Sequence, residues 1–229
     1  PPGTEVVDAG GMIVAPGFVD VQVNGGWGHD FTSDPASIGA VAARLPATGV
    51  TAFVTTIVTS SAARRAAAID AYARLAATPT AAAAAAAVGL HFEGPMIAPD
   101  RAGAHDPSRI GAVEPDEYAT WAAGGVRLVT LAPETPGALA AIERLSADEV
   151  VVSIGHTACS AADFAVARVA GAAAVTHLFN AMAPFGHRAP GPIGATLADP
   201  TVVAGLICDG LHVDPVAVAA AWRALGNER

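Results

Sequence analysis

The stretch "GVTAFVTTIV", residues 49–58, decides the fold class, because almost every position in it is apolar or β-branched. A strand that is covered on both faces has this composition, whereas a half-exposed strand alternates apolar and polar residues. The segment that follows it, 61–77, is rich in alanine and is typical of a helix. Together they indicate one strand–helix unit of a parallel sheet.

The same alternation recurs along the whole chain. Strands are expected at 18–23, 50–54, 88–92, 126–131, 150–154, 173–177 and 202–207. Helices are expected between and after them at 35–46, 61–77, 114–123, 136–145, 160–169 and 213–225. Seven strands with regular helical crossovers favour an α/β fold of the (β/α)₈ barrel type over an open sheet.

Composition limits the possible partners and compartments. The chain has 229 residues, 52% of them hydrophobic, and a net charge of −9, which disfavours nucleic acid and acidic membrane surfaces as partners. It has no long apolar run or signal peptide, and its two cysteines have no metal or redox spacing, so we expect a cytoplasmic protein. All twelve basic residues are arginine, which excludes Schiff-base and phosphate-loop lysines.

The two ends of the sequence do not match a complete barrel. Residues 1–15 resemble the tail of another β element, so we expect a remnant of a small β domain there and a truncated barrel over 16–229. The sequence stops after the seventh expected strand, and an eight-stranded barrel without its last strand has two open edges. We therefore expect either a partner that closes the barrel or a fragment of a longer protein.

Polar residues gather at the carboxyl ends of the expected strands, where barrels of this class place their chemistry. The first strand contributes Gln22 and Asn24. Later strand ends contribute Glu93 in "HFEGP", His156 in "SIGHT", His177 and Asn180 in "THLFNAM", and Asp209 and His212 in "CDGLH".

Glu93, His156 and His177 form the candidate metal set. One carboxylate and two imidazoles suit Zn²⁺ or a similar divalent ion with positions left open for water. Each residue also has a structural alternative: either histidine can be a hydrogen-bonded core residue, and Glu93 can cap the next segment. His91 lies two residues before Glu93 on the same strand face, and we expect it to have a packing role.

Other polar residues are candidates for substrate contacts. His105 lies in the loop "RAGAHDP", and loops at this face of a barrel carry function. Asn180, Arg188 and His212 are donors that could converge on an anion, and arginine is well suited to phosphate.

Five motifs together resemble the N-acetylglucosamine-6-phosphate deacetylases of the amidohydrolase superfamily. They are "APGFVDVQVNGG", "GLHFEGPMIAPDRAGAHDP", "SIGHT", "VTHLFNAMAPFGHRAPG" and "ICDGLHVDP", and they span residues 10–215 in the order of the family. The resemblance implies a metal-dependent hydrolase that converts N-acetyl-D-glucosamine 6-phosphate to glucosamine 6-phosphate and acetate in amino-sugar catabolism. It also implies a barrel beside a small β-sandwich, a cytoplasmic location and a homodimer.

The resemblance also implies roles for individual positions. Glu93, His156 and His177 match the metal ligands, and His105 matches the residue that polarises the acetamide carbonyl. The remaining matched positions are substrate contacts: Ala104, Asn180, Ala181 through its backbone N–H, and, on the phosphate side, Arg188 and His212. We expect Asp209 to orient its neighbours or bind substrate.

The sequence departs from the family at the proton-transfer step. Family members use an aspartate on the eighth strand as general base and then acid, and this sequence ends at Arg229, before that motif is expected. Two alternatives therefore stay open. The chain could be a non-catalytic remnant or phosphosugar-binding module, or an amidohydrolase for another N-acetylated amino sugar or a cyclic amide. The absence of lysine disfavours the cyclic-amide hydrolases that bridge two metals with a modified lysine.

The segment "FVDVQVNGG", residues 18–26, predicts how many metals are bound. Many relatives in the superfamily place a His-x-His pair where this strand has Gln22 and Asn24, and neutral amides are weaker ligands than imidazole for such ions. We therefore expect one tightly bound metal ion, Zn²⁺ or alternatively Fe²⁺. Gln22 and Asn24 should hold water or support the metal ligands, and Asp20 should be a structural hydrogen-bonding residue.

Overall fold

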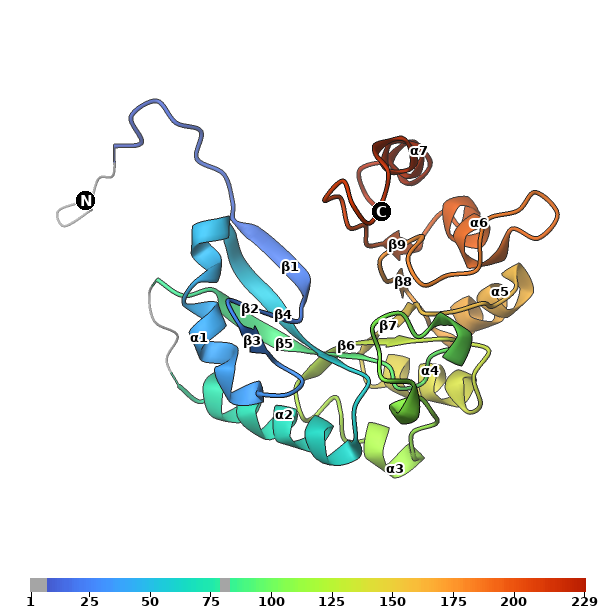
Figure 1. The fold of residues 1–229 in the computed structure, drawn as a ribbon, viewed down its shortest axis with the longest axis horizontal. Coiled ribbons are helices and arrows are strands. Elements are labelled where there is room, and N and C mark those ends of the chain that lie inside the picture. Colours follow the sequence, from blue (N-terminus) through green and yellow to red (C-terminus); the bar gives the residue numbers. More distant parts are fainter. Residues whose placement is uncertain (1–7, 79–82) are drawn as a thin grey trace.

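The computed structural model describes residues 8–78 and 83–229 and contains one curled sheet of seven parallel strands (Figure 1). Their order in the sheet follows the sequence: β1 (Phe18–Val23), β4 (Val50–Val58), β5 (Ala86–Glu93), β6 (Val126–Leu131), β7 (Val151–Ile154), β8 (Ala174–Val175) and β9 (Val203–Ala204). Each neighbouring pair is parallel. The predicted α/β fold with an incomplete barrel is confirmed.

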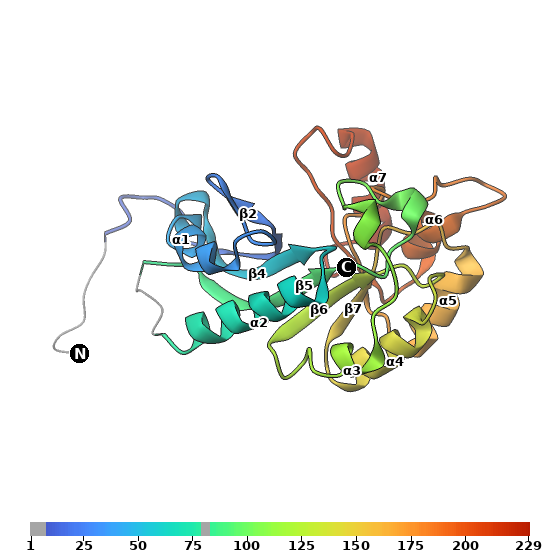
Figure 2. The same cartoon turned by 60° about the horizontal axis from the view of Figure 1, so that its bottom comes forward.

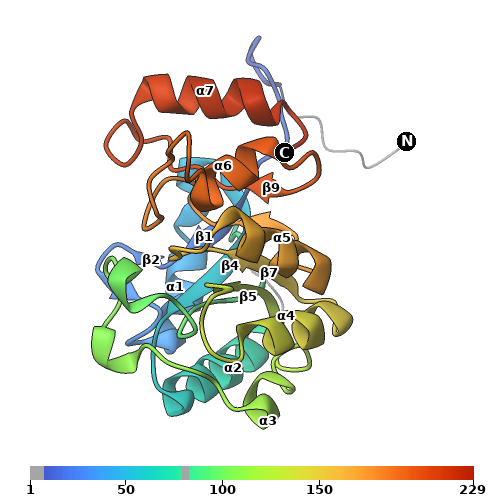
Figure 3. The same ribbon diagram turned by 90° about the vertical axis from the view of Figure 1, so that its right-hand side faces the viewer.

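Helices connect the strands and cover the outer side of the sheet, as Figure 2 shows for α2 to α5. They are α1 (Ile38–Ala42), α2 (Ala62–Ala76), α3 (Pro115–Tyr118), α4 (Ala138–Ala147), α5 (Ala161–Ala170), α6 (Gly191–Ala198) and α7 (Pro215–Leu225). Figure 3 shows α7 beside α6 at one end of the molecule. No helix in the described part of the chain has the length and apolar character needed to cross a membrane.

Short elements fill several of the connections. A small hairpin of β2 (Gly25–Gly26) and β3 (His29–Asp30) follows β1. Single turns of 3₁₀ helix are η1 (Pro35–Ser37), η2 (Leu45–Thr48), η3 (Pro99–Arg101) and η4 (Pro107–Arg109).

Local sequence signals explain where the main helices begin. Ser160 and Asp163 form a reciprocal capping box at the start of α5. Asp214 accepts a hydrogen bond from the backbone N–H of Val216, and Pro215 occupies the first position of α7, where a missing N–H costs nothing.

The structure corrects several expected boundaries. The helix expected at 35–46 is divided among η1, α1 and η2, and only Pro115–Tyr118 of the helix expected at 114–123 forms α3. Helix α6 was not predicted, because "GPIGATLA" begins with glycine and proline and reads as a loop. The strand expected at 173–177 pairs only over Ala174–Val175, since the backbone turns at His177, where φ is 34°.

The remnant of a β domain expected at 1–15 lies partly outside the described residues. Within the described residues 8–15, the backbone forms a turn and no strand.

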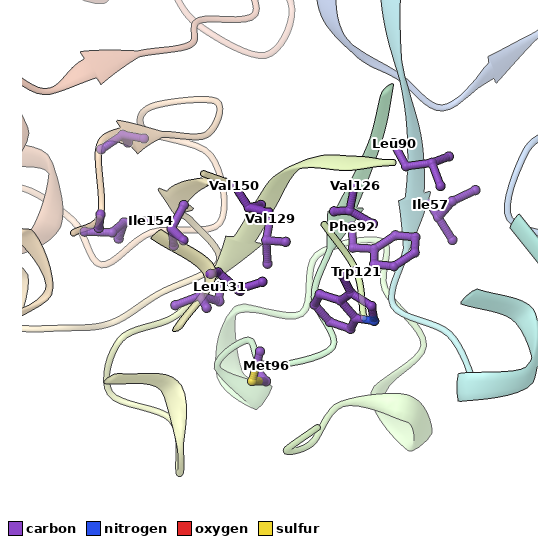
Figure 4. Packing of buried hydrophobic residues seen from close by; sticks show 14 of the residues in the cluster. Ile57, Leu90, Phe92, Met96, Trp121, Val126, Val129, Leu131, Val150 and Ile154 are labelled. Atoms are coloured by element: carbon purple, nitrogen blue, oxygen red, sulfur yellow. The ribbon is translucent and has the colours of Figure 1, made fainter. Parts of the chain in front are cut away.

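The main hydrophobic core lies between the sheet and the helices (Figure 4). Phe92 on β5 packs edge-on against Trp121, with ring centroids 4.9 Å apart, and both rings are completely or almost completely buried. Because Phe92 immediately precedes Glu93, this contact also fixes the strand end that carries the carboxylate.

Replacing Trp121 with alanine should therefore lower the free energy of unfolding by about 3–5 kcal/mol, as expected for the loss of a buried aromatic side chain. The matched control is Trp222→Ala, because Trp222 is 59% exposed on α7 and its loss should cost less than about 1 kcal/mol. Urea unfolding followed by circular dichroism measures both values. Equal losses for the two variants would contradict this description of the core.

Candidate metal centre

Three strand ends bring Glu93, His156 and His177 together. Glu93 is the last residue of β5, His156 follows β7 by two residues, and His177 follows β8 by two residues. One ligand atom from each side chain lies within 4.8 Å of those of the other two. Oε1 of Glu93 lies 3.0 Å from Nε2 of His177 and 3.3 Å from Nε2 of His156.

Both histidines have an unusual backbone conformation. Their φ values are 48° at His156 and 34° at His177, in the left-handed region that residues other than glycine seldom adopt. Such strained positions persist where the surrounding structure holds them, and they concentrate at functional sites. Here the sharp turns direct both rings toward the carboxylate of Glu93.

The hydrogen bonds of His156 identify its metal-binding atom. Nδ1 of His156 lies 2.8 Å from the carbonyl oxygen of Arg101, which can only accept, so Nδ1 carries the proton. Nε2 is then unprotonated in the neutral ring and faces Oε1 of Glu93 and Nε2 of His177, the latter at 3.1 Å. This is the arrangement that metal-ligating histidines commonly show.

The donor set fits a divalent cation. Three atoms with lone pairs converge, and the unprotonated Nε2 of His156 cannot donate to the carboxylate it faces, so a cation between them removes the repulsion. Two imidazoles and one carboxylate match the ligands of a catalytic Zn²⁺ site with open coordination positions. Glu93, His156 and His177 would hold this ion.

Glu93 remains ionised despite its burial. Burial alone raises the pKa of the Glu93 carboxyl, but the three imidazole rings packed around it, those of His105, His156 and His177, outweigh that effect and hold the pKa far below its usual range. An ionised carboxylate is the form that a metal ligand requires.

Gln22 and Asn24 occupy different environments. Nε2 of Gln22 donates a hydrogen bond of 3.0 Å to Oε1 of Glu93, so Gln22 supports a metal ligand from β1. Asn24 is exposed and uses its backbone oxygen to accept from the N–H of Phe31.

Asp20, on the same strand, has a structural hydrogen bond: its Oδ1 accepts from the backbone N–H of Gln22 at 3.0 Å. The opposite, valine face of β1 is more exposed than its sequence suggests, with Val19 62% and Val21 54% exposed.

His105 lies against the same carboxylate. Its side chain is buried, and its Nε2 lies 3.6 Å from Oε2 of Glu93. The ring centroids of His105 and His156 are 4.3 Å apart. Ala104, the preceding residue, is exposed.

The expected anion-binding residues are not joined in one cluster. Asn180 and Ala181 are half-buried in the loop after His177, and the carbonyl of Ala181 accepts from the N–H of Thr157. Arg188 and His212 are exposed, and in the described part of the chain Arg188 forms no hydrogen bond or ion pair with the other candidates.

Asp209 shapes the turn that carries His212. It accepts hydrogen bonds from the backbone N–H groups of Leu211 and His212, and its Oδ2 lies 2.7 Å from Nδ1 of His212. The two backbone hydrogen bonds, then that of the His212 side chain, lower the pKa of Asp209 to about 2.

The site borders a cleft of about 840 Å³ between the two edges of the sheet. The cleft is lined by β1 on one side, by residues 205–209 after β9 on the other, and by His177. Its lining includes Gln22, Asn24 and two carboxylates, Asp20 and Asp209.

Sequence reasoning missed Glu134, which follows β6. Its carboxylate accepts from the hydroxyl of Thr157 and the backbone N–H of Ala158, each at 2.6 Å, and so holds the loop that carries His156. The same strand-end rule could have found it, because Glu134 is the first ionisable residue after the strand expected at 126–131.

His91 belongs to a buried polar network inside the curled sheet. Its ring nitrogens lie 3.1 Å from the hydroxyl of Thr56 and 2.8 Å from that of Thr130. The hydroxyl of Thr130 continues to Thr176, and that of Thr176 to Ser153, each at 2.6 Å. The network links the four neighbouring strands β4 to β7 and the residue that directly follows β8.

Comparison with known proteins gives strong sequence similarity to one group. No protein-family model matches the chain. It is 38% identical to N-acetylglucosamine-6-phosphate deacetylase of Bos taurus, over 95% of this chain and 56% of that protein. It is 35% identical to the Bacillus subtilis enzyme of the same name, over 100% of this chain and 59% of that protein. It is also 36% identical to N-acetylgalactosamine-6-phosphate deacetylase of Shewanella, over 95% and 55%.

Solved structures give the same result. A mutant N-acetyl-D-glucosamine-6-phosphate deacetylase from Mycobacterium smegmatis, in complex with N-acetyl-D-glucosamine-6-phosphate, matches with a TM-score of 0.84 and 36% identity, over 92% of this chain and 55% of that one. The Thermotoga maritima enzyme matches with a TM-score of 0.82 and 28% identity, over 91% and 56%. The predicted resemblance is confirmed, and the chain spans between half and three-fifths of these relatives.

The site predicts one tight metal ion per chain, which His177→Ala should abolish because the substitution removes one of three ligands. Gln22→Ala removes only the support of Glu93 and should weaken binding by roughly 10- to 100-fold. Equilibrium dialysis with Zn²⁺, followed by elemental analysis, measures both effects, and His29→Ala, outside the ligand set, is the control. Two tight ions per chain, or unchanged binding by His177→Ala, would contradict the assignment.

His91 should make stability depend on pH. Desolvation, partly opposed by Glu93, lowers the pKa of His91 from 6.5 to about 4. Between these values the unfolded chain binds more protons than the folded one, so the free energy of unfolding falls as the pH falls through this window. The contribution of His91 is about 2 kcal/mol between pH 7 and pH 5.

Urea unfolding of the metal-free protein at both pH values measures this effect. The decrease should be smaller by about that amount in His91→Gln. The matched control is His29→Gln, which removes a histidine outside the buried network. An identical decrease in the protein and in His91→Gln would contradict the assignment.

Proposed function

We propose that this chain carries the metal centre of an N-acetylglucosamine-6-phosphate deacetylase. The reaction would be hydrolysis of the acetamide of N-acetyl-D-glucosamine 6-phosphate to glucosamine 6-phosphate and acetate. The observation that carries the proposal is the convergence of Glu93, His156 and His177, with His105 against the same carboxylate. The similarity over nearly the whole chain to proteins of that name supports the choice of substrate.

A divalent ion at Glu93, His156 and His177 would supply a Lewis acid and lower the pKa of a water molecule. The resemblance favours Zn²⁺, with Fe²⁺ as the alternative. Gln22 restrains Glu93 by donating to Oε1, so the carboxylate keeps one orientation toward the two imidazoles.

His105 would polarise the acetamide carbonyl. Its Nε2 is directed to the metal-facing carboxylate, so a carbonyl oxygen entering beside Glu93 lies within its reach. A donor already in place is most effective as negative charge develops on that oxygen in the tetrahedral transition state.

The proton of the attacking water has to reach the leaving amine through a base that then acts as an acid. The carboxylates lining the cleft are poor candidates: Asp20 already accepts from Gln22, and the pKa of Asp209, about 2, makes it a weak base. We assign this step to the eighth-strand aspartate that the resemblance places after Arg229.

The phosphate would be bound by Asn180, Arg188 and His212, with Ala104 and the backbone N–H of Ala181 contacting the sugar. Asp209 holds the turn that presents His212 and so acts through it. A homodimer and a cytoplasmic location complete the proposal and rest on the family resemblance.

A second candidate is binding of the phosphosugar without turnover. The low pKa of Asp209, which makes it a weak base, favours it for the chain as given. An N-acetylgalactosamine 6-phosphate substrate is a variant of the main proposal, supported by the similarity to the Shewanella protein.

Acetate release from both phosphosugars tests the proposal, using the chain alone and a form extended beyond Arg229, each with its metal content measured. We expect release by the extended form. Metal and phosphosugar binding without release by either form would favour the binding module, and neither binding nor release would contradict both.

Arg188→Ala should raise KM for the phosphorylated substrate roughly 10- to 100-fold, because a charge-assisted hydrogen bond to phosphate is lost. KM for the unphosphorylated sugar should change little. The control, Arg74→Ala on the outer helix α2, should change neither. Equal losses for both sugars in Arg188→Ala would rule out Arg188 as a phosphate contact.

A further inference from the structure

The side chain of Thr59 is directed at His105, although the two residues are 46 positions apart in the sequence. Thr59 follows the end of β4 directly. Its hydroxyl oxygen lies 2.7 Å from Nδ1 of His105, and its backbone N–H also points at Nδ1, with the nitrogen atoms 3.3 Å apart. Both residues are buried.

These contacts define the tautomer of the neutral ring. A backbone N–H can only donate, so Nδ1 of His105 has to be the acceptor and Nε2 carries the proton. The Thr59 hydroxyl at 2.7 Å adds a second donor to the same nitrogen. Nε2–H then faces the region beside Oε2 of Glu93, 3.6 Å away.

We propose that Thr59 is a positioning residue for the deacetylation reaction, which holds the His105 ring in the tautomer and orientation that present Nε2–H to the substrate carbonyl. The proposal rests on the proposed function for its kinetic consequence but not for its structural content. Without Thr59 the ring could rotate or adopt the other tautomer, and Nε2 would then present a lone pair to a developing oxyanion.

The Thr59 hydroxyl packs closely against the end of β5. Its single proton has two acceptors in reach, Nδ1 of His105 at 2.7 Å and the carbonyl oxygen of Glu93 at 3.4 Å, and the proposal assigns it to the nearer one. A Cβ at Gly94 would meet the hydroxyl oxygen at 2.2 Å, so glycine at 94 permits this close approach. Thr59 therefore lies between the metal-binding strand end and the loop that carries His105.

The following residue anchors the segment to the helices. The carbonyl of Ser60 accepts a hydrogen bond from the guanidinium of Arg65, which is buried on α2. Arg65 also forms two hydrogen bonds to the carboxylate of Glu117, of 2.6 and 2.9 Å. This bidentate pair prevents the segment 59–60 from moving away from His105.

Three variants separate positioning from general stability. Thr59→Val keeps the shape but removes the hydroxyl, and Thr59→Ser restores the hydroxyl. The matched control is Thr56→Val, which removes another buried hydroxyl of β4 that contacts a histidine, but the contact is to His91.

The first readout is ¹⁵N NMR of the histidine rings in the metal-free chain, at a pH where His105 is neutral. The proposal predicts a protonated Nε2 and an acceptor Nδ1 for His105 in the protein, in Thr59→Ser and in Thr56→Val. In Thr59→Val the Nδ1 signal should shift because only the backbone donor remains. A protonated Nδ1 in the unaltered protein, or no shift in Thr59→Val, would overturn the proposal.

The second readout is kcat in the form that releases acetate. Loss of one hydrogen bond to His105 should lower kcat roughly 3- to 10-fold in Thr59→Val, with KM nearly unchanged and Thr59→Ser close to the unaltered enzyme. A fall of similar size in Thr56→Val would show a general structural effect and overturn the proposal.

If no form releases acetate, the proposed function fails, and the NMR result still decides the role of Thr59. If Thr59→Val does not fold, the tautomer in the unaltered protein and in Thr59→Ser decides it.

Discussion

The buried negative charge of Glu93 is the constraint on which the rest of the site depends. A carboxylate removed from water is costly unless polar partners surround it. Here Gln22 reaches it from β1, His156 and His177 from the ends of β7 and β8, and His105 from the loop after β5. These partners come from different parts of the sheet and can meet only because the sheet curls. The curled fold therefore supplies the polar surroundings that the buried carboxylate needs. A divalent cation would complete the compensation and hold the two imidazole Nε2 atoms, 3.1 Å apart, around a common centre.

Residues that surround the candidate metal ligands and His105 hold this arrangement in place. Arg101 fixes the ring of His156 through its carbonyl, Glu134 holds the loop just after His156, and Thr59 holds His105. The hydroxyl network around His91 ties neighbouring strands together beneath the ligands. The candidate metal ligands and His105 are therefore placed by strands and short turns, whereas Arg188 and His212, the proposed substrate contacts, are exposed.

The sequence predicted the structure best where one simple pattern of apolar and polar residues defined a strand, its end or its inner face. Near-continuous apolar strands predicted the parallel sheet, and the strand-end rule selected Glu93, His156 and His177, which the structure brings together. The alternation in "FVDVQVNGG" placed Gln22 on the inner face, where it meets Glu93. The pairing of Thr59 with His105 could not be predicted, because it joins loops 46 residues apart through one hydroxyl and one backbone N–H. Likewise, the left-handed turns at His156 and His177 and the helix α6 are set by tertiary packing and have no local sequence signal.

Anomalous X-ray diffraction from crystals grown with Zn²⁺, recorded at the zinc absorption edge, shows whether Glu93, His156 and His177 hold one metal ion. We predict one strong peak per chain, about 2.0–2.2 Å from Nε2 of His156, Nε2 of His177 and an oxygen of Glu93. Gln22 should remain hydrogen-bonded to Glu93 and outside ligand distance of the peak. A second strong peak at Gln22 and Asn24, or no peak among the three proposed ligands, would contradict it.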